Sequence, residues 1–526
     1  DLEKSCGIGE FTDLLPFARW AHECGMRLIQ LLPINDTGEE RSPYSALSAF
    51  ALHPVYITLS ALPLSSPLQK KVDQFSQQHR QDAMIAWLDV VRFKRSILRE
   101  HYSSHFAQIS KEKPFLAWIE QNQWVKPYAV FSLLKEQEEM KSWQEWSRYQ
   151  NPTLARIDAI WSKNWEEVLF FSWVQWIAEG QLLQVSQQLS AMGVMLKGDI
   201  PILLSEDSAD VWHLRKFFDL NNRAGAPPDM FCYAGQNWRF PAYRWSVIER
   251  DNYSWWRARL RQAAKFYSAY RIDHVLGFFR IWQVPETEQT GVLGRFVPAV
   301  PLRRSDLLAA GFSPERVDHL VDPLFPAERV AALFDGLGRD GRPWLKQVEG
   351  GWKIDRERFS SETALFNSDE PQPVKDALIQ LYWDRVLLRF EESGSDYHPH
   401  WYWYDSNTFH LLTAEEQGAL RRLIEANYQL QEPLWTEHGK KILTMMLEES
   451  DMLVCAEDLG VVPPCVPRTL EEMGILGLKI ERWTRDWEAP GQPWVAMERY
   501  PRLSVCSPGT HDTSSLRGYW EETTWP

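Results

Sequence analysis

The sequence predicts an α/β fold in which short parallel strands are separated by helical connections. Several short apolar segments have the composition of strands that are buried on both faces, and long segments with helical spacing lie between them. In parallel α/β barrels the reactive groups collect at the carboxyl ends of the strands. Four of the predicted strands deliver an acidic residue there: Asp199, Asp273, Glu457 and Asp512. Together these observations favour a parallel barrel whose reactive groups gather at one end.

Length and charge restrict the classes of protein that fit this sequence. With 526 residues and 44% hydrophobic content, the chain is long enough for roughly three domains or one barrel with insertions. The net charge of −14 argues against an anionic membrane surface and against nucleic acid, which attracts basic proteins. No apolar run approaches the roughly 18 residues that a membrane-spanning helix needs. We therefore expect neither a nucleic-acid nor a membrane partner.

The six cysteines are scattered and form no CxxC pair. This distribution is typical of reduced thiols in a cytosolic protein, and the first residues show no signal-peptide pattern. No cluster of histidine and cysteine has metal-ligand spacing. We therefore expect a cytoplasmic protein without a metal or a cofactor.

Tryptophan is abundant, with 27 residues against 25 Phe and 17 Tyr. Flat rings suit the apolar faces of sugars, and the indole N–H can donate to a hydroxyl group. Most of these side chains are expected to fill the core. Composition alone therefore favours a carbohydrate ligand only weakly.

Residues 1–63 are predicted to form the first part of the barrel. An amphipathic segment from Phe11 to Cys24 predicts a helix, and the apolar run at 27–34 predicts a buried parallel strand. The loop that follows holds Tyr44 near its tip. Loops after parallel strands commonly carry functional residues.

Residues 64–190 have a different composition, rich in Gln, Lys, Glu, Trp and Leu. Helical spacing is clear at 81–101, 128–139 and 165–190. We expect a mainly helical insertion here.

Residues 191–285 return to strands and loops and form the predicted middle of the barrel. The segment 194–202 predicts a strand that carries Asp199. A long ordered loop is expected next, because Gly, Pro, Asp and Asn are frequent there. It holds side chains that stack on sugars or hydrogen-bond to them: Asp229, Gln236 and Trp238.

Residues 286–445 are predicted to form a second insertion, in which polar, Pro-rich loops alternate with helical segments. Its segment HPHWYWY, from His398 to Tyr404, is dense in histidine and aromatic residues. A metal site is one interpretation. Because no carboxylate or Cys partner has metal-ligand spacing, packing or an edge of a sugar site is the better interpretation.

Residues 446–526 form the remaining predicted part of the barrel. The apolar run at 452–456 precedes Glu457, and a strand at 503–506 precedes Asp512. A single acidic residue after a strand is commonly a helix cap or a loop charge. Four such residues in one chain are harder to explain in that way.

The segment from Lys265 to Pro285 is the centre of the predicted site. Side chains alternate along a strand, so Arg271 and Asp273 point to the same side. A carboxylate beside a guanidinium stays ionised and can act as a nucleophile or as an electrostatic stabiliser. A surface ion pair at a strand end is the alternative, and these few residues do not decide between the two.

Longer motifs carry a resemblance to a known family. They are SPYSALSAFALHPVYI at 42–57, GDIPILLSEDSADVW at 198–212, GAPPDMFCYAGQNWRFPAYRW at 225–245, AYRIDHVLGFFRIWQVP at 269–285, AEDLG at 456–460 and GTHDTSSLRGYW at 509–520. With these motifs in this order, the chain resembles the 4-α-glucanotransferases, the amylomaltases or disproportionating enzymes of glycoside hydrolase family 77. The resemblance implies a (β/α)₈ TIM barrel with two large, mainly helical insertions.

Three features qualify the resemblance. The second insertion separates Asp273 from Glu457, which resembles the plant cytosolic disproportionating enzymes and their bacterial relatives. Those enzymes transfer a glucosyl unit from maltose to a polymeric glucan. Asp512 is followed by Thr-Ser-Ser, where many members have Asn-Asp-Thr. The family's barrel has one more strand and helix after the strand that carries Asp512, so we expect the chain to be truncated before the last barrel strand.

The resemblance makes Asp273 the nucleophile, Glu457 the acid/base and Asp512 the residue that holds hydroxyl groups of the distorted sugar. Physical chemistry agrees, since retention needs two carboxyl groups about 5–5.5 Å apart, one ionised and one protonated. We expect Arg271 to hold Asp273 ionised. Apolar surroundings and the neighbouring charge of Asp458 are expected to raise the pKa of Glu457.

Further residues are expected to bind the substrate. They are Arg271, His274, His511, Tyr44, Trp238, Gln236, Asp199 and Asp229. The histidines can donate to sugar hydroxyls, and the aromatic rings can stack at donor and acceptor subsites. For Asp199, Asp229 and Gln236, a structural role in holding loops explains the residue as well as substrate binding does.

Three functions fit this pattern. The first is a glucanotransferase that passes glucosyl or short α-1,4-glucan units from maltose or malto-oligosaccharides to an α-glucan acceptor and releases glucose. The second is an α-glucan hydrolase of the amylase type with the same carboxylates, and the third is a glucan-binding protein that has lost catalysis. Transfer or hydrolysis depends on how well loops exclude water and bind the acceptor. The preference for the transferase therefore rests on the resemblance.

Overall fold

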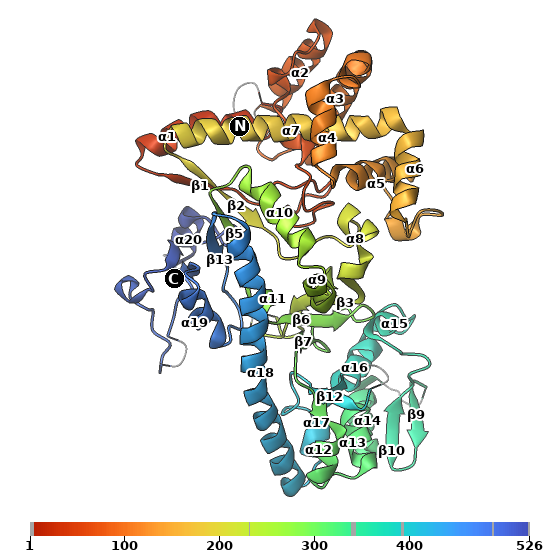
Figure 1. Cartoon of the computed structure of the whole chain (residues 1–526). Helices are drawn as coiled ribbons and strands as arrows, with labels where there is room; N and C mark the ends of the chain where they lie inside the picture. Colours follow the sequence, from red (N-terminus) through yellow and green to blue (C-terminus); the bar gives the residue numbers. More distant parts are fainter. Residues whose placement is uncertain are drawn as a thin grey trace.

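A computed structural model describes residues 5–80, 82–230, 232–337, 343–390, 394–486 and 489–523. It is a mixed α/β structure in which parallel strands lie beside long helices (Figure 1). Within these ranges, none of the helices combines the length and apolar character that crossing a membrane requires.

Four parallel strands form the central sheet, in the order β1-β2-β5-β13. They are β1 (Leu28–Gln30), β2 (Met195–Ile200), β5 (Ala269–Ile272) and β13 (Leu453–Ala456). The side chains of β5 are all buried. This is typical of a parallel strand that is covered on both faces. The predicted strands are therefore present, although the strand expected at 27–34 has only three residues.

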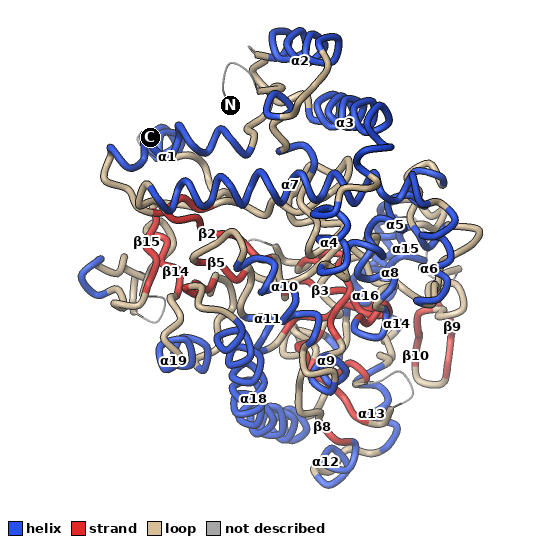
Figure 2. The backbone as a smooth tube through the Cα atoms, turned by 45° about the horizontal axis from the view of Figure 1, so that its top comes forward, coloured by secondary structure: helices blue, strands red, loops and turns tan. Residues whose placement is uncertain are grey.

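A second parallel pair continues this series. It consists of β14 (Gly477–Ile480) and β15 (Ser504–Ser507), and a parallel bridge between Cys455 and Leu476 joins it to β13. The six strands thus lie side by side in chain order, with β1 and β15 at the two ends of the series. Figure 2 shows β2, β5, β14 and β15 close together on one side of a long helix, α7 (Trp165–Ala191).

The predicted helical content of residues 64–190 is present. These helices share one hydrophobic core with the central sheet, because α7 packs on both α1 and β2. The other helices in this part of the chain are α1 (Leu14–Glu23), α2 (Ser66–His79), α3 (Trp87–Ile109), α4 (Lys113–Gln121), α5 (Val125–Gln137) and α6 (Leu154–Lys163).

An antiparallel sheet, in the order β4-β3-β6-β7, follows β2 in the sequence, and its last strand, β7, lies within residues 286–445. Its strands are β3 (Phe218–Ala226), β4 (Gln236–Tyr243), β6 (Ile281–Pro285) and β7 (Arg295–Val297). The prediction of a long loop is therefore wrong in part, because Gly225 pairs with Asn237 and Ala226 pairs with Gln236 in the β3–β4 hairpin. Gly225 permits this pairing, since a Cβ there would lie 1.9 Å from the carbonyl oxygen of Gln236.

Short helices complete this middle part of the chain. They are α8 (Ala209–His213), α9 (Trp245–Arg250), α10 (Ser254–Ala264) and α11 (Leu276–Phe279).

Residues 286–445 contain more strand than predicted. A three-stranded antiparallel sheet, β11-β12-β8, and a β9–β10 hairpin lie among the helices, and two separate hydrophobic clusters fill this region. The strands are β8 (Leu302–Arg303), β9 (Leu345–Val348), β10 (Gly351–Ile354), β11 (Leu387–Arg389) and β12 (Asp396–Pro399). The description of this region as mainly helical is therefore only partly right.

The helices of this region lie at the end of the molecule opposite α7 (Figure 1). They are α12 (Arg304–Ala309), α13 (Pro314–Val321), α14 (Ala327–Phe334), α15 (Glu362–Phe366), α16 (Gln372–Trp383) and α17 (Asn407–His410). The long helix α18 (Ala414–Glu449) runs back from this end toward the central sheet and crosses the expected boundary at residue 445.

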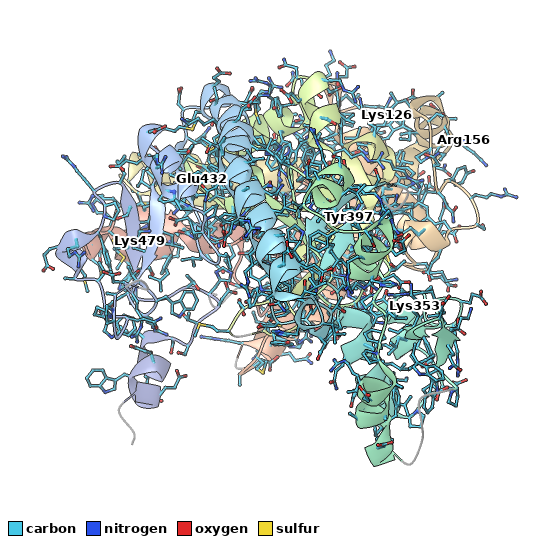
Figure 3. The ribbon with its side chains drawn as sticks, turned by 90° about the horizontal axis from the view of Figure 1, so that it is seen from below. Lys126, Arg156, Lys353, Tyr397, Glu432 and Lys479 are labelled. Atoms are coloured by element: carbon cyan, nitrogen blue, oxygen red, sulfur yellow. The ribbon has the colours of Figure 1, made fainter. Side chains whose placement is uncertain are left out.

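The last described helices are α19 (Cys465–Glu472) and α20 (Leu516–Thr523), and Figure 1 shows both on the same side of the molecule as β13. Figure 3 shows Lys479 of β14 on the opposite side of the molecule from Lys126 of α5 and Arg156 of α6. The central sheet therefore lies between the C-terminal strands and the helices of the first insertion.

Candidate active site

The buried guanidinium of Arg271 contacts carboxyl groups at the carboxyl ends of the central strands. Arg271 of β5 and Asp199 of β2 are register partners, and Arg271 Nη1 donates to both carboxylate oxygens of Asp199, at 3.0 and 2.8 Å. The same nitrogen donates to Asp273 Oδ1 at 3.0 Å. The predicted alignment of Arg271 with Asp273 is confirmed, because two residues along a strand return the side chain to the same face.

Glu457 approaches the same guanidinium from the next strand. It follows β13, and its Oε2 lies 4.0 Å from Arg271 Nη2. The backbone N–H of His274 donates to Oε2 at 2.9 Å, and that of Leu459 donates to Oε1 at 2.8 Å. The parallel pairing of β5 with β13 thus places the carboxyl groups of Asp273 and Glu457 on two sides of one cation.

Burial raises the pKa of both carboxyl groups. The pKa of Asp273 lies above its usual value because burial, together with the charge of Glu457, outweighs the attraction of Arg271. Arg271 lowers the pKa of Asp273, in the direction that the sequence predicts, but burial shifts that pKa further in the opposite direction. Asp273 is nevertheless the better candidate for the ionised member of the pair, since its side chain is 23% exposed and touches Arg271 at 3.0 Å, whereas that of Glu457 is 11% exposed.

The raised pKa of Glu457 agrees with the sequence prediction, but its main cause is burial. Asp458 contributes little to that pKa because its carboxylate faces away. Asp458 Oδ1 accepts from the backbone of Leu478 at 2.6 Å, and Oδ2 lies 3.4 Å from Lys479 Nζ. Burial, rather than a like charge, is therefore what favours the protonated form of Glu457.

Tyr44 joins two distant parts of the chain at this cluster. Its hydroxyl donates to Asp199 Oδ2 at 3.3 Å and lies 3.0 Å from His511 Nε2. The rings of Tyr44 and His511 stack with centroids 5.7 Å apart. His511 Nε2 also lies 3.3 Å from Asp512 Oδ2, and the Asp512 side chain is 70% exposed. Asp512 is therefore linked to the cluster through His511 and remains open to a ligand.

Trp238 contacts His274, the residue that follows Asp273. The two rings meet edge to face with centroids 4.9 Å apart, and Trp238 Nε1 donates to Gln236 Oε1 at 2.9 Å. His274 has a φ of +49°, an uncommon conformation for a residue with a side chain, and such strain gathers at functional sites. Burial lowers the pKa of His274 to about 4, so its imidazole is neutral near pH 7.

Two of the predicted substrate-binding residues lie where a structural role suits them. The side chain of Asp199 is 0% exposed and is satisfied by Arg271 and Tyr44, and burial raises its pKa to about 7. Asp229 lies in the β3–β4 turn, where its Oδ1 accepts from the backbone of Cys232 at 2.7 Å. These contacts favour the alternative that the sequence left open for both residues.

Sequence reasoning missed Arg482, which follows β14. Its Nη1 donates to the carbonyl oxygen and the hydroxyl of Ser514, at 2.9 and 3.1 Å, and so supports the turn after Asp512. The signal was available, because the run Ile475 to Ile480 is followed by Glu481 and Arg482, the same pattern of a short strand followed by charges.

The HPHWYWY segment packs rather than gathers metal ligands. His398 is buried and stacks on Phe390 with centroids 4.6 Å apart, and His400 is also buried. In the part of the chain that the structure describes, no group of three or more His, Cys, Asp or Glu side chains is arranged to hold a metal ion.

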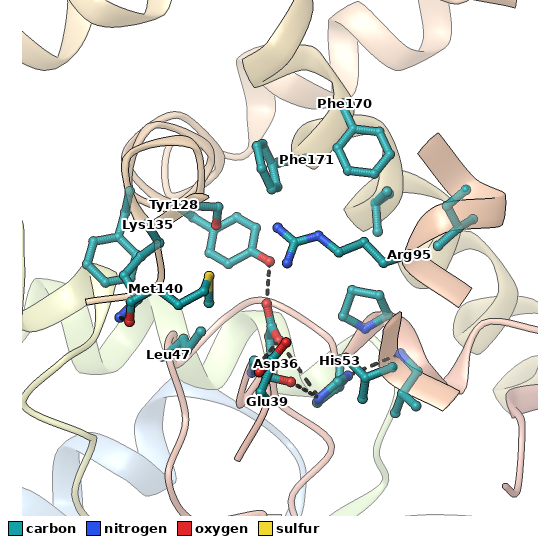
Figure 4. A pocket seen from close by; sticks show the side chains of 18 residues that line it. Asp36, Glu39, Leu47, His53, Arg95, Tyr128, Lys135, Met140, Phe170 and Phe171 are labelled. Atoms are coloured by element: carbon teal, nitrogen blue, oxygen red, sulfur yellow. Dashed lines mark hydrogen bonds and ion pairs between the residues drawn. The ribbon is translucent and has the colours of Figure 1, made fainter. Parts of the chain in front are cut away.

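A separate cavity of about 70 Å³ lies behind the segment that carries Tyr44 (Figure 4). Asp36 and His53 line it from that segment, and Arg95 and Tyr128 line it from α3 and α5. Tyr128 donates to Asp36 Oδ2 at 2.5 Å, and the Asp36 carbonyl accepts from the backbone of Leu47 at 2.6 Å. These contacts fix the base of the loop that carries Tyr44.

A comparison with known families shows to which family the chain belongs. The profile of the family described as 4-alpha-glucanotransferase matches residues 2–525. The chain belongs to the 4-alpha-glucanotransferase family. It is 34% identical to the 4-alpha-glucanotransferase DPE2 of Oryza sativa subsp. japonica, over 99% of this chain and 57% of the rice protein. It is 29% identical to the 4-alpha-glucanotransferase of Chlamydia muridarum, over 99% of this chain and 73% of that protein.

Solved structures of 4-alpha-glucanotransferase relatives share the fold. The amylomaltase from Streptococcus agalactiae in complex with acarbose superposes with a TM-score of 0.62 at 18% identity, over 99% of this chain and 79% of that one. The amylomaltase from Corynebacterium glutamicum gives a TM-score of 0.60, also at 18% identity, over 99% of this chain and 54% of that one. The chain thus spans between about half and four fifths of the length of these relatives. Its membership of a transferase family does not favour the hydrolase alternative.

Proposed function

We propose that this chain carries the catalytic site of a 4-alpha-glucanotransferase that moves glucosyl or short α-1,4-glucan units from maltose or malto-oligosaccharides to an α-glucan acceptor. The observation that carries the proposal is the placement of Asp273 and Glu457, on adjacent parallel strands, on two sides of Arg271. Retaining glycosidases use such a pair of carboxyl groups. The relatives named 4-alpha-glucanotransferase support the same reaction class.

In the first step, Asp273 attacks the anomeric carbon of the donor and forms a covalent glycosyl–enzyme intermediate. Glu457, whose pKa burial raises, donates its proton to the glycosidic oxygen, and the leaving sugar departs; from maltose it is glucose. Arg271 holds the Asp273 carboxylate in place through the 3.0 Å contact. The exposed Asp512 carboxylate accepts hydrogen bonds from sugar hydroxyl groups, with His511 beside it.

In the second step, the acceptor replaces the leaving sugar. Glu457, now a carboxylate, takes the proton from an acceptor hydroxyl group, whose oxygen attacks the anomeric carbon and releases Asp273. Two inversions at one carbon give net retention. The reaction is transfer when a sugar occupies the acceptor position and hydrolysis when water does, so a site that excludes water favours the transferase.

We also propose that the six parallel strands belong to a (β/α)₈ barrel and that the protein is cytoplasmic. The chain-ordered series from β1 to β15 supports the barrel, because consecutive parallel strands are the repeat of that fold. The six cysteines, all free, support a reducing compartment.

Incubation of the protein with maltose and glycogen tests the proposal. Glucose release matched by growth of the glycogen outer chains is expected, and the Asp273→Asn variant should show neither. Glucose release without chain growth would instead identify a hydrolase. If the wild-type protein binds glycogen and releases no glucose, the site is a binding site only.

A further inference from the structure

An exposed aromatic surface joins the β3–β4 hairpin to the second insertion. The rings of Tyr233, in the hairpin turn, and Tyr402, after β12, stack with centroids 4.6 Å apart and planes 19° from parallel. The Tyr402 hydroxyl also donates to the carbonyl oxygen of Tyr233 at 2.9 Å. We name this surface, with the neighbouring Met230 and Tyr404, the tyrosine surface.

The tyrosine surface is open to solvent. The Tyr233 residue is 67% exposed although Tyr402 covers one face of its ring, so the other face of that ring is free. Met230 and Tyr404 are also exposed. Grouped, exposed apolar side chains of this kind are uncommon on a protein surface unless they bind something.

The hairpin turn that carries Tyr233 packs closely on the second insertion. Gly235 has a φ of +62°, and a Cβ there would lie 2.8 Å from the carbonyl oxygen of Ala226 and 3.0 Å from Gly291 Cα. Asn237 Nδ2 donates to the carbonyl oxygen of Glu288 at 2.8 Å. The second insertion therefore holds the turn at Gly291 and Glu288 as well as at Tyr402, and a surface fixed in advance loses little entropy when a ligand binds.

The groups around the rings suit a neutral, hydroxyl-rich ligand. The carboxylates of Asp229 and Asp405, with the hydroxyls of Tyr233 and Tyr404, lie near enough to Tyr402 to raise its pKa, although burial is the main cause. Carboxylates accept hydrogen bonds and hydroxyls both donate and accept. Aromatic faces beside such acceptors match a sugar, which has apolar ring faces and a rim of hydroxyl groups, whereas the carboxylates would repel an anion.

The tyrosine surface is also close to the catalytic carboxylates along the chain. Tyr233 precedes Trp238 by five residues, so their Cα atoms are at most about 18 Å apart even for a fully extended backbone. The ring of Trp238 contacts that of His274, the residue after Asp273. One oligosaccharide chain several glucose units long can therefore reach from the site of bond formation to the tyrosine surface.

We propose that Tyr233 and Tyr402 form an α-glucan-binding surface that holds a polymeric acceptor at a distance from the bond being made. The inference rests on the proposed function for the identity of the glucan. It adds a role for the second insertion, which supplies Tyr402 and fixes the hairpin that supplies Tyr233.

Binding to glycogen in the Asp273→Asn background tests this surface without turnover. Native electrophoresis through gels with increasing glycogen content gives an apparent Kd. Adding Tyr233→Ala or Tyr402→Ala should raise that Kd about three- to tenfold, the loss expected for one aromatic stacking contact. Adding Trp20→Ala, which removes a ring from the exposed Phe17–Trp20 stack on α1, should leave it unchanged.

Two further variants separate binding from folding. Tyr402→Phe keeps the ring and loses only the hydrogen bond to Tyr233, so it should bind glycogen within about twofold of the background variant. Tyr233→Ala removes a mostly exposed ring and should keep the melting temperature, which differential scanning fluorimetry checks. Unchanged glycogen affinity in both alanine variants overturns the inference, as does failure of the Asp273→Asn protein to bind glycogen.

Kinetics of the otherwise wild-type protein distinguish this inference from the proposed function. With maltose as donor, Tyr233→Ala and Tyr402→Ala should raise KM several-fold more for glycogen than for maltotriose, which is too short to reach both sites. Equal changes for the two acceptors contradict the inference while leaving the transferase intact. Tyrosine-dependent glycogen binding without any transfer contradicts the proposed function and leaves the binding surface intact.

Discussion

Arg271 Nη1 lies between two carboxylates, 2.8 Å from Asp199 Oδ2 and 3.0 Å from Asp273 Oδ1. Asp199 is fully buried and Asp273 is partly exposed. The buried Asp199–Arg271 pair thus fixes the guanidinium, and the guanidinium fixes the carboxylate of Asp273, the proposed nucleophile. Asp199 is a positioning residue, since it acts on Asp273 only through Arg271.

Replacement of Arg271 by lysine should therefore lower kcat about 100-fold and change KM for maltose less than threefold. An ammonium group keeps the charge, but it cannot replace a planar guanidinium that contacts both carboxylates. Initial rates of glucose release from maltose measure this split. Arg261→Lys, at an exposed arginine paired with Glu449, is the matched control and should keep the wild-type rate. A higher KM with an unchanged kcat would show that Arg271 binds the sugar instead.

Glu457→Gln should lower the rate with maltose about 100- to 10,000-fold, the contribution typical of a general acid. Maltosyl fluoride needs no proton on its leaving group, so the variant should still release a burst of about one fluoride per enzyme. Because burial raises the pKa of Glu457, wild-type kcat/KM for maltose should fall as the pH rises through that raised pKa. A fluoride burst that is lost together with maltose turnover would contradict the role of Glu457 as the acid.

Tyr44→Phe should lower kcat/KM about tenfold, because the ring keeps its stacking on His511 while the contacts of the hydroxyl with Asp199 and His511 are lost. His511→Asn should lower kcat/KM by a similar factor. Since the two variants remove one shared hydrogen bond, the double variant should lose less than the product of the single losses. A double-mutant cycle on kcat/KM measures this coupling, expected at about 1 kcal/mol. Strict additivity would show that the two side chains act independently.

The local parts of this site were predictable from the sequence, and the non-local parts were not. The spacing of Arg271 and Asp273 sets a shared face by strand geometry alone. The contact of Arg271 with Asp199 depends on the register of β2 with β5, which no local pattern encodes. The raised pKa of Asp273 has the same origin, because burial comes from segments far away in the sequence.

The fold shows the same division. The strand β13 is a buried apolar run and was predicted, whereas β14 contains Gly477 and Lys479 and was missed. The β3–β4 hairpin was assigned to a loop because Gly, Pro, Asp and Asn are frequent in this segment, although Gly225 allows a close backbone approach in the sheet. Composition indicates which residues suit a turn. It does not show that β3 pairs with β6, and this pairing is what makes the segment part of a sheet.

The second insertion should lose stability as the pH falls. Burial lowers the pKa of His398 and His400 to about 3, against about 6.5 in an unfolded chain. The unfolded state therefore binds more protons between these values, so the free energy of unfolding rises with pH in that window and falls on acidification. By pH 4.5 the loss should be roughly 2–3 kcal/mol for each histidine.

His400→Gln should remove about half of this pH dependence, because glutamine does not titrate. Melting temperatures between pH 4.5 and pH 7 measure it. The matched control is His22→Gln, which replaces an exposed histidine of α1 and should keep the full dependence. If His400→Gln and the wild-type protein lose the same amount of stability on acidification, the buried histidines are not the cause.

Two glycine substitutions should have opposite effects on stability. Gly198 of β2 lies against a half-buried ring, and a Cβ there would come within 2.4 Å of Tyr267 Cε2. Gly198→Ala should therefore lower the free energy of unfolding by about 1–3 kcal/mol, the usual cost of overpacking a core. In α7 a Cβ at Gly180 meets nothing within 4 Å, so Gly180→Ala should raise it by about 0.5–1 kcal/mol through helix propensity.

The position of Gly198 also connects packing to catalysis. It precedes Asp199, so a shift of β2 away from Tyr267 displaces the carboxylate that fixes Arg271. Gly198→Ala should therefore lower kcat as well as the melting temperature, whereas Gly180→Ala should change only the melting temperature. Measuring both quantities at a temperature where each variant is fully folded separates the two effects. Full activity of folded Gly198→Ala would show that the Asp199–Arg271–Asp273 arrangement tolerates a shift of β2.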